Sequence, residues 1–328
     1  MLPKILPGKI FGTLLGICLG CSQLFAEPTP PPRPADVAMN QEAGRGGLLL
    51  LPLRLADGEQ VAMVMDTGSP LTVLDKSLAH QLGAKLDSGN LNTFDTHQTA
   101  VVYLAPKLFL GDVQLQTGSN VLVADLPKLS GYLKPPIKGI LGMDCLGHYC
   151  VQLDFQAGMV RFLDSEHLDT NNLGRSYPLH FESGQPHGGV PFIRHAGLLG
   201  GTVTNTIIDT GNNSDGMTQG RAIRKNAGGS YSGGLIKRTK HFLAVEGWVN
   251  HPVGSLKCEW DGNTYTNVAV ARGPRDCPNW IGLAFLARHQ VTLDFPDAMM
   301  YLKQISSGPR AGPAKTDGIA GEKPKPKT

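Results

Sequence analysis

The sequence predicts an all-β protein built from two similar halves, and two observations carry this prediction. The chain holds 41 Gly and 24 Pro among its 328 residues, about one residue in five against a typical ~12%. Turns therefore divide the chain into pieces that are too short for long helices. The second observation is a repeated motif, which reads Val64-Met65-Asp66-Thr67-Gly68 in one half and Ile207-Ile208-Asp209-Thr210-Gly211 in the other.

The two copies of the motif stay in register further along the chain. Gly139-Ile140-Leu141-Gly142 matches Asn279-Trp280-Ile281-Gly282, and each copy then reaches a Leu-Asp-Phe triplet, at Leu153–Phe155 and at Leu293–Phe295. The last Gly lies 12 residues before the Asp of the triplet in both copies. A repeat of this length indicates a duplicated structural unit.

Short aliphatic runs between Gly and Asp turn signals predict the strands of each unit. In the first half these runs are Leu48–Leu55, Gln60–Met65, Val101–Leu110, Val121–Ala124, Cys150–Phe155 and Met159–Leu163. In the second half they are Val203–Ile208, Phe242–Val249, Gly254–Trp260 and Asn267–Ala271. We expect short helices at Asp75–Leu82 and at Cys145–Gly147 or Leu283–Arg288, and a loop or flap at Ser214–Lys240.

The charge of the chain is concentrated at its ends. The net charge is +3, but residues 1–26 carry two bases and no acid, and residues 306–328 carry five bases and two acids. Residues 27–305 therefore have a net charge of −2, which argues against a basic surface for nucleic acid on the folded part. We expect no nucleic-acid partner.

The first 26 residues have the pattern of an export signal. Two lysines precede the apolar run Ile10–Leu19, and Ala26 ends a candidate cleavage site; the run is too short to span a bilayer. Gly20-Cys21 also fits a lipoprotein signal, so lipidation at Cys21 stays open beside plain secretion. We expect an exported protein, periplasmic or secreted, that meets a membrane only if Cys21 is lipidated.

These features divide the chain into five segments. We expect a signal peptide at residues 1–26, a proline-rich linker at 27–45, two lobes at 46–168 and 169–305, and a disordered basic tail at 306–328.

Four cysteines lie outside the signal, namely Cys145, Cys150, Cys258 and Cys277. In an exported protein they predict two disulfides with three possible pairings, and nearest neighbours would join Cys145 to Cys150 and Cys258 to Cys277. We expect no metal, because the body holds no C-x-x-C or H-E-x-x-H spacing. We also expect no nucleotide, because the glycine-rich run 228–234 lacks the lysine and the spacing of a phosphate loop.

The two Asp-Thr-Gly motifs suggest a chemistry. A carboxylate that ends an apolar strand is costly unless it is solvated, paired or hydrogen-bonded, and a following Gly lets the backbone turn closely around it. If the halves pack about a twofold axis, Asp66 and Asp209 meet and share one proton. Such a pair can hold a water and hydrolyse a carbonyl compound by general acid–base catalysis.

The paired motifs resemble the two-lobed aspartic peptidases of pepsin type, and the short lobes resemble single-lobe retropepsins fused in tandem. The resemblance covers roughly residues 46–303 and implies a bilobal β fold with a cleft between the lobes. It implies that Asp66 and Asp209 form the catalytic dyad, that Thr67 and Thr210 lock the two loops together, and that Gly68 and Gly211 complete the motifs. It also implies that Ser69 donates to Asp66, that Asn212 takes the equivalent place beside Asp209, and that Gly142 and Gly282 pack behind the loops.

The flap of such a peptidase is harder to place. The family often places a tyrosine on a hairpin that closes over the cleft, and Tyr103 lies in the half of the chain where this hairpin is expected. Its neighbours, however, predict a core strand, which is the interpretation that we favour. Residues Leu91–Thr99 are an equally good flap tip. The resemblance predicts a monomeric aspartic endopeptidase that acts on peptides or proteins without a cofactor. The alternatives are a catalytically inactive bilobal protein that binds peptides and an envelope scaffold.

Overall fold

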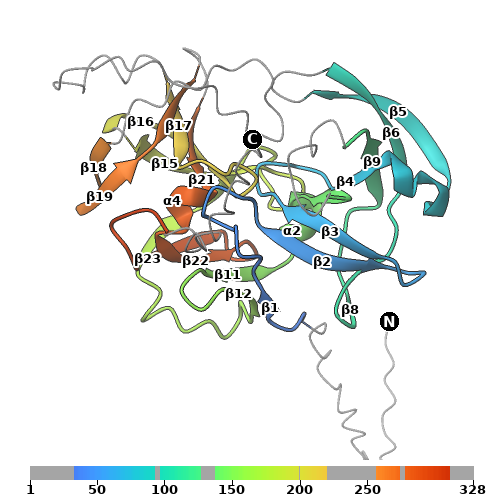
Figure 1. The fold of residues 1–328 in the computed structure, drawn as a ribbon, viewed down its shortest axis with the longest axis horizontal. Coiled ribbons are helices and arrows are strands. Elements are labelled where there is room, and N and C mark those ends of the chain that lie inside the picture. The colour runs from blue at the N-terminus through green and yellow to red at the C-terminus, as the bar shows by residue number, and fades with distance from the viewer. Residues whose placement is uncertain are drawn as a thin grey trace, which may run out of the picture. The chain divides into compact units, whose positions relative to one another are not determined.

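The computed structural model describes residues 33–92, 97–126, 137–198, 200–219, 256–273 and 278–310. The residues from Arg33 onward form one compact unit, and all the elements below belong to it. Most of them are strands (Figure 1). Within these ranges, no helix has the length and apolar character needed to cross a membrane.

The N-terminal lobe is built on a nine-stranded sheet in the order β5-β6-β9-β4-β10-β3-β2-β7-β8. Along the chain its strands are β2 (Leu50–Leu55), β3 (Gln60–Met65), β4 (Val73–Asp75), β5 (Lys85–Asn92), β6 (His97–Leu104), β7 (Leu108–Leu110), β8 (Val113–Gln114), β9 (Asn120–Ala124) and β10 (Gly139–Leu141). The hairpin of β2 and β3 forms because leucines alternate along β2 and a turn follows at Gly58, whose φ is 97°. Such a φ favours glycine.

The C-terminal lobe repeats this arrangement in a six-stranded sheet, in the order β14-β15-β16-β21-β17-β20. These strands are β14 (His180–Phe181), β15 (Pro191–Gly197), β16 (Gly200–Asp209), β17 (Gly216–Gln219), β20 (Val270–Gly273) and β21 (Asn279–Gly282), and β18 (Leu256–Trp260) and β19 (Asn263–Val268) form a separate pair. In both lobes the strand that ends at Asp-Thr-Gly runs parallel to a later strand, β3 beside β10 and β16 beside β21. The sequence repeat is therefore also a structural repeat.

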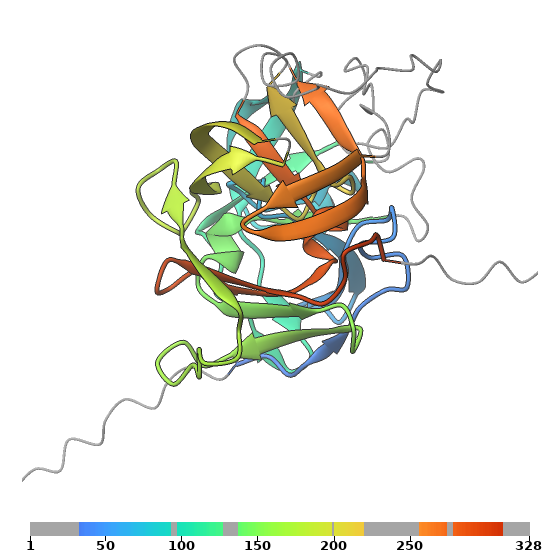
Figure 2. The ribbon, with the colours of Figure 1, turned by 90° about the vertical axis from the view of Figure 1, so that its left-hand side faces the viewer.

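A third sheet of six strands joins the two lobes, in the order β1-β12-β11-β22-β23-β13. It contains β1 (Val37–Ala38), β11 (Cys150–Asp154), β12 (Met159–Leu163), β13 (Arg175–Pro178), β22 (His289–Asp294) and β23 (Met299–Gln304). The equivalent strands β11 and β22 pair antiparallel at its centre, with Gln152 opposite Thr292. This pairing is what a twofold axis between two copies of one unit requires, and Figure 2 shows the sheet beneath the orange strands of the C-terminal lobe.

Each lobe also extends a loop onto the short helix of the other. The helices are α2 (Met143–Leu146) and α4 (Leu283–Leu286). The loop before β2 brings Gly44 against Ala287 at the end of α4, and the loop before β15 brings the carbonyl of Pro186 against Gly147 at the end of α2. One apolar core, with Leu51 in one lobe and Ile208 in the other, continues through both. The predicted all-β, two-lobed architecture is confirmed.

The predicted elements hold with local differences. The run expected at Val101–Leu110 forms two strands, β6 and β7, because Pro106 between them has no N–H for a ladder. The helix expected at Asp75–Leu82 is a 3₁₀ helix over Lys76–Gln81, which the Asp75 side chain caps by accepting from the Ser77 N–H. The strand expected at Phe242–Val249 and most of the loop expected at Ser214–Lys240 lie outside the described residues, although residues 216–219 of that loop form β17.

The folded body begins before residue 46. Val37 and Ala38 pair with β12 as strand β1, and Ala43 is fully buried in the core. The C-terminal part of the predicted proline-rich linker is therefore packed against the lobes. The tail expected at 306–328 is described only as far as Arg310, whose guanidinium donates to the carbonyl of Ala43 at 2.9 Å.

The cysteine prediction is wrong for the first pair. Cys145 and Cys150 are free thiols and both are buried. Cys145 belongs to the apolar core, as do Val151 and Leu153 of β11. Side chains alternate along a strand, so Cys150 points to the opposite face of the sheet from Val151 and away from this core. Cys258 is also a free thiol, and Cys277 lies outside the described residues.

Candidate active site

The structure brings the two Asp-Thr-Gly loops together. Asp66 directly follows β3 and Asp209 is the last residue of β16. Each of these strands is flanked by the later parallel strand of its lobe, and the N–H of Asp66 donates to Leu141 of β10 at 3.0 Å. Both carboxylates therefore sit at ends of strands that are held on both sides.

Thr67 and Thr210 connect the two loops by four reciprocal hydrogen bonds. The Thr67 hydroxyl donates to the carbonyl of Ile208 at 2.7 Å and accepts from the N–H of Thr210 at 3.0 Å. The Thr210 hydroxyl donates to the carbonyl of Met65 at 2.7 Å and accepts from the N–H of Thr67 at 3.0 Å. Both threonines are fully buried, so each lobe fixes the position of the other lobe's loop.

The carboxyl groups of Asp66 and Asp209 are hydrogen-bonded to one another. Burial raises the pKa of Asp66, against the hydrogen bonds that favour its charge. Burial, and then the charge of Asp66, raises the pKa of Asp209 well above its ordinary value. Because two adjacent carboxylates do not both ionise easily, this pair retains one proton over a range of pH in which isolated aspartates are charged.

The glycines of the two motifs make the close approach possible. A Cβ added to Gly68 would lie 2.6 Å from Oδ1 of Asp209, and one added to Gly211 would meet the carboxyl of Asp66. Each glycine also donates its N–H to the aspartate of its own loop, at 2.8 Å for Gly68 and 2.9 Å for Gly211. A larger residue at either position would push the opposite carboxyl away.

Gly142 and Gly282 lie directly behind the two loops. A Cβ on Gly142 would be 2.9 Å from the carbonyl oxygen of Ser69, and one on Gly282 would be 2.8 Å from that of Asn212. The first residue of α2 donates its N–H to the Ser69 carbonyl at 2.8 Å, and the first residue of α4 donates to the Asn212 carbonyl at 2.7 Å. The helices thus hold the two Asp-Thr-Gly loops from behind, and the absence of a side chain on each glycine allows this close approach.

Two predicted side-chain contacts differ from the structure. The hydroxyl of Ser69 donates to the carbonyl of Leu71 at 2.7 Å rather than to Asp66. The side-chain oxygen of Asn212 accepts from the N–H of Ser214 at 3.0 Å and from its hydroxyl at 2.8 Å, which shapes the loop. The backbone N–H groups of Ser69 and Asn212 favour the charged forms of the adjacent aspartates instead. Backbone donors have replaced the expected side-chain donors.

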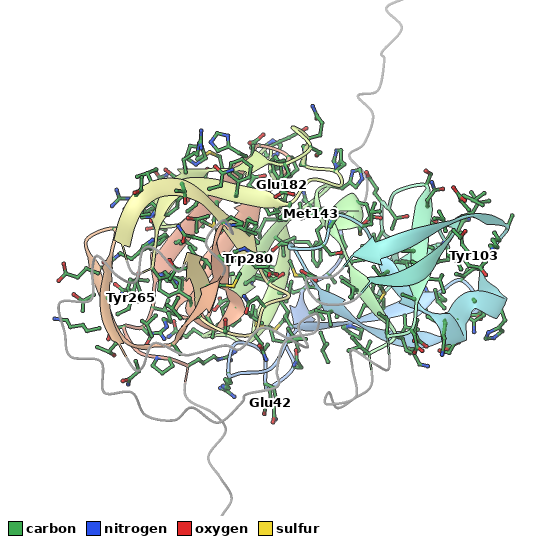
Figure 3. The ribbon with its side chains drawn as sticks, turned by 90° about the horizontal axis from the view of Figure 1, so that it is seen from above. Glu42, Tyr103, Met143, Glu182, Tyr265 and Trp280 are labelled. Carbon is green, nitrogen blue, oxygen red and sulfur yellow. The ribbon has the colours of Figure 1, made fainter. Side chains whose placement is uncertain are left out.

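Tyr103 is a strand residue. It lies in β6, paired with Val121 of β9, and it packs against the apolar core. Figure 3 shows it on the N-terminal lobe, far from Trp280 in β21 of the other lobe. The last residue pair between β5 and β6 is Asn92 with His97, and residues 93–96 lie outside the described residues. The alternative flap tip, at residues Leu91–Thr99, includes these four residues.

Sequence reasoning missed two buried polar contacts that support the loops. In the N-terminal lobe the Thr72 hydroxyl donates to Asp144 of α2 at 2.7 Å. In the C-terminal lobe Arg288 forms an ion pair with Asp215 at 2.9 Å. An arginine directly after the apolar run Leu283–Ala287 was the one available signal, because a charge in such a run needs a buried partner.

The described residues contain no group of three or more His, Cys, Asp or Glu side chains placed to hold a metal ion. A sequence model of the family described as aspartyl protease matches residues 51–145. This segment contains Asp66, Gly142 and most of the N-terminal lobe, so the match supports an aspartic-protease relationship for that lobe. No curated protein matches the chain significantly.

Proposed function

We propose that this protein is an aspartic endopeptidase that hydrolyses peptide bonds. The observation that carries the proposal is the pair of carboxyl groups of Asp66 and Asp209, hydrogen-bonded to each other and clamped by Thr67 and Thr210. The aspartyl protease match over residues 51–145 supports the same reaction class.

In the proposed reaction one carboxyl of the pair is ionised and the other is protonated. The ionised carboxylate takes a proton from a water that attacks the peptide carbonyl, and the protonated carboxyl donates to the carbonyl oxygen. The tetrahedral intermediate then breaks down as the nitrogen leaves with a proton from the pair. No covalent enzyme intermediate and no cofactor is needed, and the proton belongs to the pair rather than to either residue.

The test is incubation of the purified protein with a peptide library, followed by mass spectrometry of the products. We expect discrete cleavage products from the unmodified protein and none from Asp66→Asn or Asp209→Asn, which keep the size of the side chain but cannot share the proton. Cleavage by either variant at the unmodified rate would exclude the dyad mechanism.

A catalytically inactive peptide-binding or envelope scaffold protein is the alternative, and the same experiment separates the two. Peptides that bind without being cut by any version of the protein would favour the alternative. The presence of both aspartates and of the glycines against which they pack supports the enzyme, because a binding protein does not need two carboxyl groups that share a proton.

The proposal extends to substrate and location. The expected substrate is a peptide or protein, the expected state is a monomer, and the expected place is outside the cytoplasm, in the periplasm or secreted, because residues 1–26 have the pattern of an export signal. Lipidation at Cys21 would place the enzyme at a membrane surface.

A further inference from the structure

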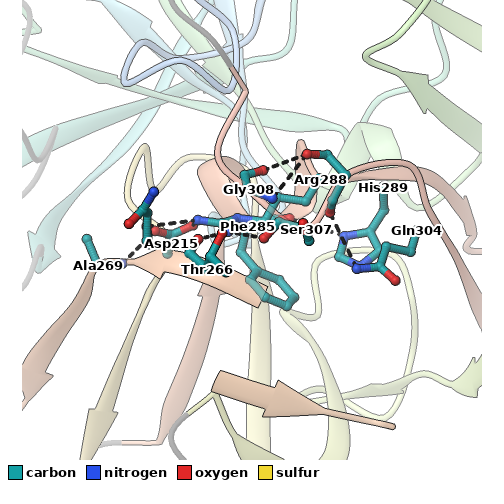
Figure 4. A network of polar contacts seen from close by, with 11 residues as sticks. Asp215, Thr266, Ala269, Phe285, Arg288, His289, Gln304, Ser307 and Gly308 are labelled. Carbon is teal, nitrogen blue, oxygen red and sulfur yellow. Dashed lines mark hydrogen bonds and ion pairs between the residues drawn. The ribbon is translucent and has the colours of Figure 1, made fainter. Parts of the chain in front are cut away.

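Arg288, just beyond α4, is a fully buried arginine in the C-terminal lobe. Its guanidinium lies at the centre of the contacts drawn in Figure 4. A buried charge is tolerated only when it is paired and hydrogen-bonded, so the groups that surround Arg288 show what it holds.

The guanidinium connects three segments that are far apart in the sequence. One nitrogen donates to Oδ1 of Asp215 at 2.9 Å, in the loop that follows Asp209. Another donates to the carbonyl of Thr266 in β19 at 2.7 Å and to the carbonyl of Ser307 at 3.1 Å, beyond β23. One side chain therefore joins the Asp209 loop, the β18–β19 hairpin and the C-terminal segment.

Asp215 connects Arg288 to the loop that contains Asp209. Its backbone carbonyl accepts from the N–H of Gly282 at 2.9 Å, directly behind the candidate dyad, and its Oδ2 accepts from the N–H of Ala269 at 2.8 Å. Only five residues separate Asp215 from Asp209. A shift of the Asp215 carboxylate would therefore move the strand end and the glycine against which the Asp209 loop rests.

At the equivalent place in the N-terminal lobe, the residues that the structure describes form no such ion pair. In the register of the repeat His148 corresponds to Arg288, because each lies six residues after the matched glycine. The ring of His148 stacks on His187 at 3.9 Å between centroids, on the side of α2 where the two lobes meet. Thr72 lies six residues after Asp66, as Asp215 lies six residues after Asp209, and its hydroxyl bonds to Asp144. The two halves of the dyad are thus supported by different chemistry.

We propose that Arg288 is a positioning residue for the Asp209 half of the dyad, acting through Asp215. The inference rests on the proposed function for its catalytic consequence. The guanidinium is planar and offers several N–H donors in fixed directions. These donors reach Asp215, Thr266 and Ser307, one in each of the three segments. A lysine at this position would keep the charge but not the three-way connection.

The test compares Arg288→Lys and Arg288→Met with the unmodified protein on one cleavable peptide. We expect kcat to fall about 10²-fold in Arg288→Met, the size of effect that a displacement of about 1 Å produces, with a much smaller change in KM. The kcat of Arg288→Lys should lie between that of Arg288→Met and that of the unmodified protein. The matched control is His148→Met, at the equivalent position of the other lobe, which should keep kcat within about twofold of the unmodified value.

A double variant separates positioning from stability. Arg288→Met leaves the Asp215 carboxylate buried without its partner, and Asp215→Asn in the same chain removes that charge. We expect the double variant to regain part of the lost melting temperature while its kcat stays low. If kcat returns together with the melting temperature, Arg288 only stabilises the lobe and the proposal is overturned.

A readout that needs no cleavage is the gain in melting temperature caused by Asp209→Asn above neutral pH. We expect a clear gain in melting temperature when Asp209→Asn is made in the unmodified protein. The gain should be smaller when it is made in Arg288→Lys, because the carboxyl groups of Asp66 and Asp209 are then no longer held together. If this gain is the same in both backgrounds and Arg288→Lys keeps full kcat, the positioning role is excluded. If no peptide is cut by any version but the gain still shrinks, the peptidase proposal fails and the positioning role stands.

Discussion

At the scale of single residues, Asp209 lies in an unfavourable environment for a charge. It is 5% exposed, it is hydrogen-bonded to a second carboxyl, and only N–H groups such as that of Gly211 favour its ionised form. Its raised pKa has a consequence for stability as well as for chemistry, because the folded state then binds a proton more tightly than the unfolded chain does.

We predict that Asp209→Asn stabilises the fold in a pH-dependent way. Since the pKa of Asp209 is raised by folding, the contribution of its protonation to stability is fully present below the unfolded pKa of about 3.9 and is lost as pH rises through the folded pKa. Asn does not titrate, so the gain in melting temperature should be small near pH 3.5 and larger at neutral pH. A gain that is independent of pH would show that the pair does not hold its proton.

Thr67 gives a second prediction at this scale. Thr67→Val keeps the shape but leaves the carbonyl of Ile208 and the N–H of Thr210 without their partner, so it should lower the free energy of unfolding by about 2 kcal/mol, within the ~1–3 kcal/mol typical of an unsatisfied buried group. Thr67→Ser keeps the hydroxyl and is the control. Chemical denaturation measures both, and equal stability of the two variants would contradict the account.

At the scale of elements, the site depends on a strand, a tight turn and a short helix that are in direct contact. The glycine at the N-terminus of each helix has no side chain, so the backbone of the aspartate loop can rest on it. This local arrangement occurs twice, once with α2 and once with α4. It explains why an apolar-apolar-Gly motif follows each Asp-Thr-Gly motif in the sequence.

We predict that Gly282→Ala lowers both stability and activity. The added Cβ would lie 2.8 Å from the carbonyl oxygen of Asn212, which belongs to backbone that cannot move without moving Asp209, and overpacking of this kind costs about 1–3 kcal/mol. Gly83→Ala is the control, because its Cβ would make an ordinary contact with Leu104 at 3.5 Å. Thermal unfolding and cleavage rates should separate the two, and equal behaviour would contradict the close packing.

Many of the strands and turns that form the candidate site could be predicted from the sequence. The strands that lead to Asp66 and Asp209 follow from apolar runs that end at a Gly turn, and the likeness of β11 to β22 follows from the repeated Leu-Asp-Phe triplet, although their pairing does not. The hydroxyl of Ser69 could not be placed, because a turn residue has several backbone acceptors within reach. The partner of Arg288 could not be named, since Asp215 lies 73 residues away and only the packing of α4 brings the two together.

At the scale of the whole molecule, the two halves of one chain pack together as the two subunits of a symmetric dimer would, and each half supplies one aspartate to the candidate site. The sheet that contains β11 and β22 and the two crossing loops join the lobes, and one core runs through both. Both aspartates come from the same chain, so the candidate site is complete without a second copy. The pairing of Cys145 with Cys150 was mispredicted at this scale, because proximity in sequence ignores that one thiol lies in α2 and the other in β11.

A complete site in one chain predicts activity that is independent of association. Specific activity per chain should stay constant on serial dilution, and light scattering on the same samples should give the mass of a single chain. A fall in specific activity with dilution, parallel to a loss of dimer, would show that a second copy contributes to the site.

The most direct test of the account is the pH dependence of kcat/KM for one cleavable peptide. Because the proposed mechanism requires one proton on the pair, we expect a bell-shaped profile with two ionisations that belong to the pair, the upper one well above the ordinary range of an aspartate. Asp66→Asn and Asp209→Asn should show no measurable rate at any pH. A profile with a single ionisation, or a bell that survives in either variant, would contradict a proton shared between Asp66 and Asp209.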